Sequence, residues 1–254
     1  MGITNLTVER RRDPLGIDAP RPRFSWRPDT GQTAYHLQVL DTDDPQASWS
    51  APTWDSGRRE SADSTYIAYS GPALAARHRY AWRVRVWNAH DEESAWSEPA
   101  AFEMGLLSPD DWSARWIAHV VPDLASEPEE RGALHAAPLL RRRFALDGPP
   151  RRARLYITAL GLYEVYLNGG RVGDERLAPG WTDYHVRIQY QTHDVTGLLH
   201  EGDNALAVRL GDGWYTGSVG AWGRHRYGDV PALMCQLEPQ LPSGARVIVA
   251  SDDR

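Results

Sequence analysis

The apolar residues of this chain recur at every second position, in short runs that turn residues interrupt about every eight to twelve positions. That period is typical of β-strands with one buried and one solvated face, and runs at this spacing indicate a β-sandwich. Residues 80–86 show the pattern best, and their expected core side chains are Tyr80, Trp82, Val84 and Val86. No segment has the 3.6-residue period of a long helix. The sequence therefore predicts an all-β protein and disfavours an α/β enzyme fold.

The length of 254 residues suits two modest domains. We expect residues 1–107 to form an immunoglobulin-like or fibronectin type III-like sandwich with residues 80–86 as its central strand. Further strands are expected at residues 24–26, 34–40, 94–97 and 101–104. Trp87 has the opposite parity from Trp82 and is predicted to be more exposed.

A linker and a second sandwich are expected to follow. Residues 108–137 should begin with one helical turn that Ser108 caps, and residues 121–132 mix prolines with acids, which indicates a long exposed loop. Residues 138–254 are predicted to form a jelly-roll-like domain, with a tight hairpin at Asn168-Gly169 and a short helical turn within residues 194–199. Its strands are expected at residues 139–146, 153–160, 162–167, 205–210, 232–237 and 247–250.

Charge and composition exclude several function classes. The net charge is −6 although every basic residue is arginine, so the arginine triplets at residues 10–12 and 141–143 do not predict nucleic-acid binding. No apolar run reaches the roughly 20 residues of a membrane span, and the start of the chain lacks the apolar core of a secretory signal. The single cysteine, Cys235, excludes a disulfide scaffold. A cytoplasmic protein without membrane or nucleic-acid partners is expected.

Catalytic and metal-binding motifs are not evident. His185, His193 and His200 lack the spacing of a metal site, and we expect no metal or cofactor. Glycoside hydrolysis needs two carboxyl groups about 5–9.5 Å apart. The second domain offers Glu164, Asp174, Glu175, Asp183, Asp194 and Asp212. Acidic residues at strand ends usually form caps or turns, so we assign no catalytic residue.

Residues 211–228 are the most unusual segment, because six glycines, two tryptophans and two tyrosines occur in eighteen positions. Glycines allow the backbone to approach a surface closely, and the rings can stack on a sugar or on another domain. The candidate contact residues are Asp212, Trp214, Tyr215, Trp222, Arg224 and Tyr227. The alternative is that Trp214 and Tyr215 only plug the end of the sandwich. Residues 179–184 are interpreted as a structural turn in which Trp181 covers the sandwich.

Four motifs of the second domain occur in a recognisable order. Residues 159–169, 177–184, 190–196 and 210–217 resemble the N-terminal β-sandwich domain of bacterial α-L-rhamnosidases, and residues 1–117 resemble the module and junction that precede it. The resemblance implies the front of a glycoside hydrolase. It further implies that a helical-barrel domain, absent from these residues, releases terminal L-rhamnose with inversion.

Two functions follow from these observations. The chain is either the non-catalytic N-terminal region of an α-L-rhamnosidase or a free-standing carbohydrate-binding or adhesion protein of two sandwiches. In the first case its partners are the C-terminal catalytic domain of the parent chain and a rhamnose-containing glycoside. An exposed apolar face would favour the first, and a polar surface with one aromatic cleft the second.

Overall fold

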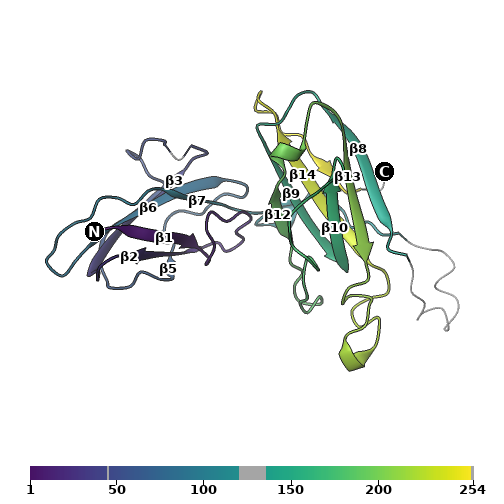
Figure 1. The fold of residues 1–254 in the computed structure, drawn as a ribbon, viewed down its shortest axis with the longest axis horizontal. Coiled ribbons are helices and arrows are strands. Elements are labelled where there is room, and N and C mark those ends of the chain that lie inside the picture. The colour runs from purple at the N-terminus through teal and green to yellow at the C-terminus, as the bar shows by residue number, and fades with distance from the viewer. Residues whose placement is uncertain (45, 120–135, 253–254) are drawn as a thin grey trace. The chain divides into compact units, whose positions relative to one another are not determined.

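The computed structural model describes residues 1–44, 46–119 and 136–252, which form two compact all-β units, Met1–Asp111 and Trp112–Arg254. Figure 1 shows the strands of both units, with β-strands as arrows and only short helical turns between them. The predicted all-β class of two sandwich domains is confirmed. No helix in the described ranges has the length and hydropathy that crossing a membrane requires.

The first unit contains two antiparallel sheets. One sheet has the order β1-β2-β5 and the other the order β4-β3-β6-β7. The strands are β1 (Ile3–Val8), β2 (Arg23–Pro28), β3 (Ala34–Asp41), β4 (Trp54–Glu60), β5 (Ile67–Ala68), β6 (Arg79–Trp87) and β7 (Ala100–Glu103). On β6, Trp82 lies opposite Val39 of β3 and Ala100 of β7, so the predicted central strand is central.

The core of the first unit is aromatic. Trp82 is 0% exposed, and its ring centroid lies 4.8 Å from that of Phe24. The alternating core positions of β6 are buried as predicted. The prediction for Trp87 is wrong, because this residue is only 6% exposed. The guanidinium groups of Arg58 and Arg85 lie 4.8 and 5.3 Å from its ring and cover the face that strand parity would leave to solvent.

Residues 94–97 do not form the strand that their pattern predicts. The structure instead places two serine hydroxyls against β6: Ser94 Oγ accepts the N–H of Val86, and Ser97 Oγ accepts the N–H of Val84. Side-chain oxygens thus replace part of a backbone ladder. On the same face Arg83 lies between the rings of Trp49 and Trp96, 4.4 and 4.3 Å from their centroids.

A 3-10 turn, η1 (Pro109–Asp111), closes the first unit. Ser108 Oγ accepts the N–H of Asp110 at 3.2 Å, and the Asp111 carboxylate accepts the N–H groups of Leu107 and Ser108. The predicted helical turn with Ser108 as its cap is therefore present. The exposed loop expected at residues 121–132 lies outside the described residues.

The second unit is a sandwich of two four-stranded antiparallel sheets, with the orders β11-β10-β13-β8 and β12-β9-β14-β15. Its strands are β8 (Leu139–Leu146), β9 (Arg152–Leu160), β10 (Leu162–Leu167), β11 (Gly170–Arg171), β12 (Gln191–Asp194), β13 (Gly202–Gly211), β14 (Ala232–Gln240) and β15 (Val249–Ala250). Two 3-10 turns, η4 (Thr196–Leu198) and η5 (Gly220–Trp222), interrupt the loops. The expected turn within residues 194–199 is η4.

Asn168 and Gly169 form the predicted hairpin turn between β10 and β11. Both have positive φ angles, 52° and 83°, as a two-residue turn of this type requires. The Asn168 side chain adds bonds to the backbone: its Oδ1 accepts the N–H of Ala205, and its Nδ2 donates to the carbonyl oxygen of Leu198. The turn therefore ties β10 to β13 and to η4.

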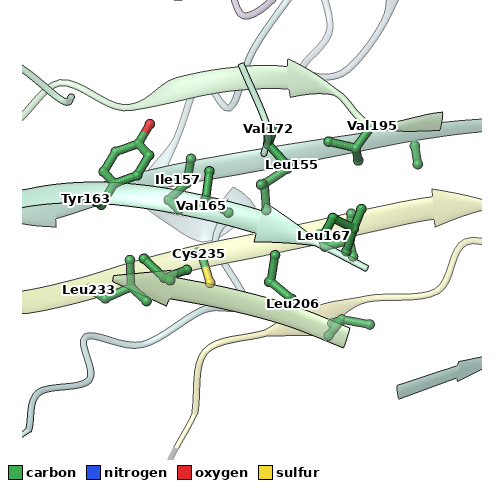
Figure 2. Packing of buried hydrophobic residues seen from close by; sticks show 14 of the residues in the cluster. Leu155, Ile157, Tyr163, Val165, Leu167, Val172, Val195, Leu206, Leu233 and Cys235 are labelled. Carbon is green, nitrogen blue, oxygen red and sulfur yellow. The ribbon is translucent and has the colours of Figure 1, made fainter. Parts of the chain in front are cut away.

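Aliphatic side chains fill the second core (Figure 2). Leu155 and Ile157 of β9 face Val165 and Leu167 of β10, and Cys235 of β14 packs beside them (Figure 2). Burial raises the pKa of the Cys235 thiol to about 12, so this cysteine is protonated at neutral pH. The second sandwich thus has an apolar core whose cysteine is unreactive, and the segments considered for function lie in its loops.

The arginine triplet of β8 lies at an edge of the second sandwich. Arg141 and Arg143 are exposed, whereas Arg142 Nη1 donates to the carbonyl oxygen of Ala250 at 2.7 Å and to Asp252 Oδ1 at 2.8 Å. Since β8 and β15 belong to different sheets, Arg142 joins the edges of the two layers.

Candidate functional site

The glycine-rich segment of residues 211–228 follows β13 and extends past the end of the second sandwich, as the yellow-green trace below β10 and β13 shows (Figure 1). Thr216 and Val219 are buried and fix its middle. The N–H of Thr216 donates to Asp212 O at 3.2 Å, and the N–H of His225 donates to Thr216 O at 3.0 Å. The segment is thus a folded loop with its own backbone bonds.

Close approach requires glycine at several positions of the loop, including Gly217 and Gly228. A Cβ at Gly217 would lie 2.1 Å from the carbonyl oxygen of Gly213, and a Cβ at Gly228 would lie 2.4–2.5 Å from the Tyr215 ring and hydroxyl. Such distances are far shorter than carbon contacts allow. At these positions the glycines therefore serve packing inside the loop, which supports part of the alternative interpretation from the sequence.

Asp212 and Arg224 bond to each other. Arg224 Nη2 donates to Asp212 Oδ2, and the two side chains are 21% and 41% exposed, respectively. The ion pair joins the two ends of the loop. Both charged groups proposed for sugar hydroxyls are therefore engaged in holding the loop closed.

The aromatic residues of the loop pack against a second loop that joins β11 to β12. Trp214 stacks on Trp181, with centroids 6.4 Å apart and planes inclined by 14°. The Tyr184 ring lies 5.4 Å from Tyr215 and 5.0 Å from Tyr227. Together with His185, 5.3 Å from Tyr227, these side chains form what we call the aromatic cluster: Trp181, Tyr184, His185, Trp214, Tyr215 and Tyr227.

Tyr184 is the buried centre of the aromatic cluster. It is 7% exposed, and its burial, with a smaller contribution from Tyr227, raises the pKa of its hydroxyl. The hydroxyl donates to the carbonyl oxygen of Gly180 at 3.3 Å. Tyr184 therefore stays neutral and holds the two loops together by ring contacts.

Hydrogen bonds from the sandwich hold the second loop in position. Tyr163 Oη, from β10, donates to Gln191 Oε1 at 2.8 Å, and Gln191 Nε2 donates to Pro179 O at 3.2 Å. The N–H of Tyr163 also donates to Ala178 O at 2.9 Å. Burial raises the pKa of Tyr163, so its hydroxyl remains a donor over the accessible pH range. The backbone that carries Trp181 is thus anchored to the core.

Trp222 lies outside the aromatic cluster. It ends η5 and is 69% exposed, and the guanidinium of Arg226 lies 5.9 Å from its ring. Gly220 and Gly223 flank it with φ angles of 51° and 75°, which permit the tight turn. The loop therefore presents one large apolar side chain at its tip.

The structure thus divides the six predicted contact residues into three groups. Trp214, Tyr215 and Tyr227 join the aromatic cluster, Asp212 and Arg224 form an ion pair, and Trp222 is exposed. Sequence reasoning missed the other half of the cluster. Trp181, Tyr184 and His185 lie in the segment interpreted as a structural turn, and Trp181 is 48% exposed. The signal that could have found them is the density of aromatic residues over residues 181–190.

Four of the six carboxylates considered for glycoside hydrolysis make local bonds, Asp212 among them through Arg224. Asp183 Oδ1 accepts the N–H of His185 at 3.1 Å, and Glu164 Oε2 accepts the hydroxyl of Tyr166 at 3.1 Å. Asp194 accepts the N–H and hydroxyl of Thr196. In the described ranges no three His, Cys, Asp or Glu side chains gather as metal ligands would.

His193 is the most buried of the three histidines considered for a metal. Desolvation lowers its pKa, against the opposing effect of Glu175 and Asp174, so the ring is neutral at pH 7. Its Nε2 is buried without a hydrogen-bond partner among the residues that the structure describes. This arrangement is that of a packed β12 side chain.

These features define an all-β protein of two consecutive sandwiches, the second carrying a loop-borne aromatic cluster. Residues 3–108 match the family model "Rha78A-like, N-terminal immunoglobulin domain", and residues 148–254 match "Alpha-L-rhamnosidase N-terminal domain". The chain belongs to the α-L-rhamnosidase family and corresponds to the N-terminal region of its members. The resemblance found in the sequence is thereby confirmed.

Similar proteins are much longer than this chain. An α-L-rhamnosidase of Formosa agariphila is 35% identical over 98% of the chain, which spans 28% of that relative. The structure of α-L-rhamnosidase from Dictyoglumus thermophilum aligns with a TM-score of 0.86 and 33% identity, over 100% of this chain and 29% of that one. The Streptomyces avermitilis enzyme complexed with L-rhamnose aligns with a TM-score of 0.85 and 28% identity, over 99% of this chain and 40% of that one.

Proposed function

We propose that the chain is the non-catalytic N-terminal region of an α-L-rhamnosidase and supports a catalytic region located elsewhere in a longer parent protein. One observation carries the proposal: two N-terminal domain models of this family together cover residues 3–108 and 148–254, while the chain spans only 28–40% of the similar proteins. In this proposal the parent enzyme releases terminal L-rhamnose with inversion.

The side chains of the second domain agree with a supporting role. Inverting hydrolysis uses an acid and a base that leave room for a water molecule between them. Asp183, Asp194 and Asp212 instead accept bonds from their own loops or pair with arginine. Carboxylates bonded in this way contribute to the local structure of their loops.

The exposed tip of residues 211–228 is the contact that we propose for the catalytic region of the parent chain. Trp and Arg are the side chains that most often dominate the energy of protein interfaces. Trp222 and Arg226 stand together at the tip, and the Asp212–Arg224 ion pair fixes the base of the loop. A rigid loop with one exposed indole suits insertion into an apolar pocket of a neighbouring domain.

Hydrolysis of an aryl α-L-rhamnoside tests the proposal. The 254-residue chain should show no turnover, and the protein encoded when the reading frame is extended past residue 254 should be active. Proton NMR of the first sugar released should show the anomer opposite to that of the substrate. Turnover by the chain alone, lost on Asp183→Asn or Asp212→Asn, would place catalysis in these residues and contradict the proposal.

Contact with a rhamnose-containing glycan is a second proposed function, and the exposure of Trp181 and Trp222 favours it. Aromatic faces accept the C–H face of a sugar. A free-standing carbohydrate-binding protein would use the same rings. It would differ in having a reading frame that ends at residue 254 and in binding glycan without any associated hydrolysis.

A further inference from the structure

Trp181 has a fixed orientation although nearly half of its surface is exposed. Its indole stacks on Trp214, and its Nε1 donates to Tyr227 Oη at 3.3 Å. At 48% exposure the ring keeps a large area in contact with water. A large aromatic side chain in such a position usually covers a core or contacts a ligand. Here the neighbour stacked on the indole is Trp214, which is itself only partly buried.

The backbone around Trp181 is fixed as firmly as the ring. Gln191 holds Pro179 from the core side, and on the other side Thr182 Oγ1 donates to the carbonyl oxygen of Arg187. A surface ordered in this way loses little conformational entropy when a ligand binds. Because the indole is already ordered in the free protein, ligand binding would not need to order it.

Tyr227 brings a hydroxyl to the edge of the same ring, and two polar side chains follow Trp181 along its own loop. Tyr227 Oη accepts the Trp181 N–H and retains its own hydrogen, which no residue described by the structure takes. The exposed imidazole of His185 lies 5.3 Å from the Tyr227 ring, and the exposed carboxylate of Asp183 accepts the N–H of His185 through one oxygen. One hydroxyl donor thus lies at the edge of the indole, and two exposed acceptor-bearing side chains lie on the same loop.

We infer that Trp181, backed by Trp214, is the platform of a monosaccharide subsite, with Tyr227, His185 and Asp183 bonding the sugar hydroxyls. A pyranose has the matching chemistry, because one side of its ring presents C–H groups and its rim presents hydroxyls. The inference rests on the proposed function only for the identity of the sugar, L-rhamnose.

Trp222 is the obvious competitor for this role and fits it less well. Its ring has no aromatic neighbour stacked on it, and its cationic partner Arg226 lies 5.9 Å from the centroid. A sugar on that face would have to compete with the guanidinium. Trp222 therefore suits a protein contact, and Trp181 suits a sugar.

Titration of the 254-residue chain with L-rhamnose, followed by the indole N–H and backbone amide NMR signals, tests the subsite. We expect saturable shifts at Trp181, Trp214 and Tyr227 with a dissociation constant in the millimolar range. Trp181→Ala should weaken binding by about tenfold or more. Trp222→Ala, which removes a more exposed indole outside the cluster, should leave the shifts at Trp214 unchanged. Glycerol, which has hydroxyls and no ring face, should cause no saturable shift.

Three results would overturn the subsite: no shifts at Trp181 and Trp214, shifts confined to Trp222, or binding that Trp181→Ala leaves intact. Circular dichroism of Trp181→Ala verifies that a loss of binding is not a loss of folding. None of these results bears on the rhamnosidase proposal, which the hydrolysis assay of the longer protein tests separately. The two proposals can therefore fail independently.

Discussion

The two sandwiches use their aromatic residues in opposite ways. In the first domain they fill the core, as Phe24, Trp26, Tyr69, Tyr80, Trp82 and Phe102 show. In the second domain the core is mainly aliphatic, and a large group of aromatic side chains gathers in two loops. The whole chain has 11 Trp and 11 Tyr, a count that suits both β-sheet cores and sugar-binding surfaces. The comparison shows that only the position of each ring distinguishes a stabilising role from a contact role.

The largest effect is expected in the first core. Trp82→Ala should lower the free energy of unfolding of the first domain by about 3–5 kcal/mol, because it removes a fully buried large ring. Chemical denaturation that resolves the two domains should show a shift in the first transition alone. Trp82→Phe is the control and should lose less. An unchanged first midpoint in the alanine variant would mean that the ring does not stabilise this core.

A smaller effect is expected where the second domain packs its rings in loops. Gly228→Ala should cost the second domain about 1–3 kcal/mol, since the new methyl group collides with Tyr215. Gly197→Ala is a matched control, because a Cβ there meets no atom within 4 Å. Equal unfolding midpoints for the two variants would show that Tyr215 can move away from the added methyl group without loss of stability.

Lowering the pH should reduce the stability of the second domain through Asp194. Burial raises the pKa of Asp194, but bonds from Thr196 and the charge of Arg154 outweigh it, so the net pKa lies below the ordinary 3.8. A depressed carboxyl pKa stabilises the fold above the unfolded value and loses that contribution as the pH falls through the folded value. Asp194→Asn should therefore flatten the acid limb of second-domain stability. An unaltered pH profile would exclude Asp194 as its source.

The smallest effect on stability is expected at the loop tip. Trp222→Ala should change the unfolding free energy of the isolated chain by less than about 0.5 kcal/mol, because the ring is mostly in solvent. Thermal or urea unfolding provides the measurement. A loss comparable with that of Trp82→Ala would contradict the division between core rings and contact rings.

The sequence predicted strands with clear alternation and missed strands without it. Period-two alternation identified the interior strand β6 and most strands of the second domain, including the edge strand β8. It did not predict β1, in which half of the residues are polar, or β4, whose residues are mostly charged or polar. The alternation of strand residues also gave a wrong prediction for Trp87. Arginine side chains from β4 and β6 cover the ring on the face that was expected to be in solvent.

Only one of the two loops of the candidate site could be predicted from the sequence. The composition of residues 211–228 is unusual enough to be noticed within the sequence. Its partner, Trp181 to His185, looks like an ordinary turn, and only the fold brings the two loops together. Nor could the sequence show that Arg224 is paired with Asp212 and not directed at a ligand. Contacts between loops depend on sheet order, which strand periodicity does not encode.

The arginines of β8 bear on how the protein behaves at high concentration. An edge strand exposes unpaired backbone groups that can recruit a strand from another molecule. Arg141 and Arg143 place exposed charge along this edge, and Arg142 fastens it to the neighbouring layer through Ala250 and Asp252. Any second molecule approaching in register would bring its own arginines against these. The arginine triplet of β8 thereby opposes the strand-by-strand association of this sandwich into an aggregate.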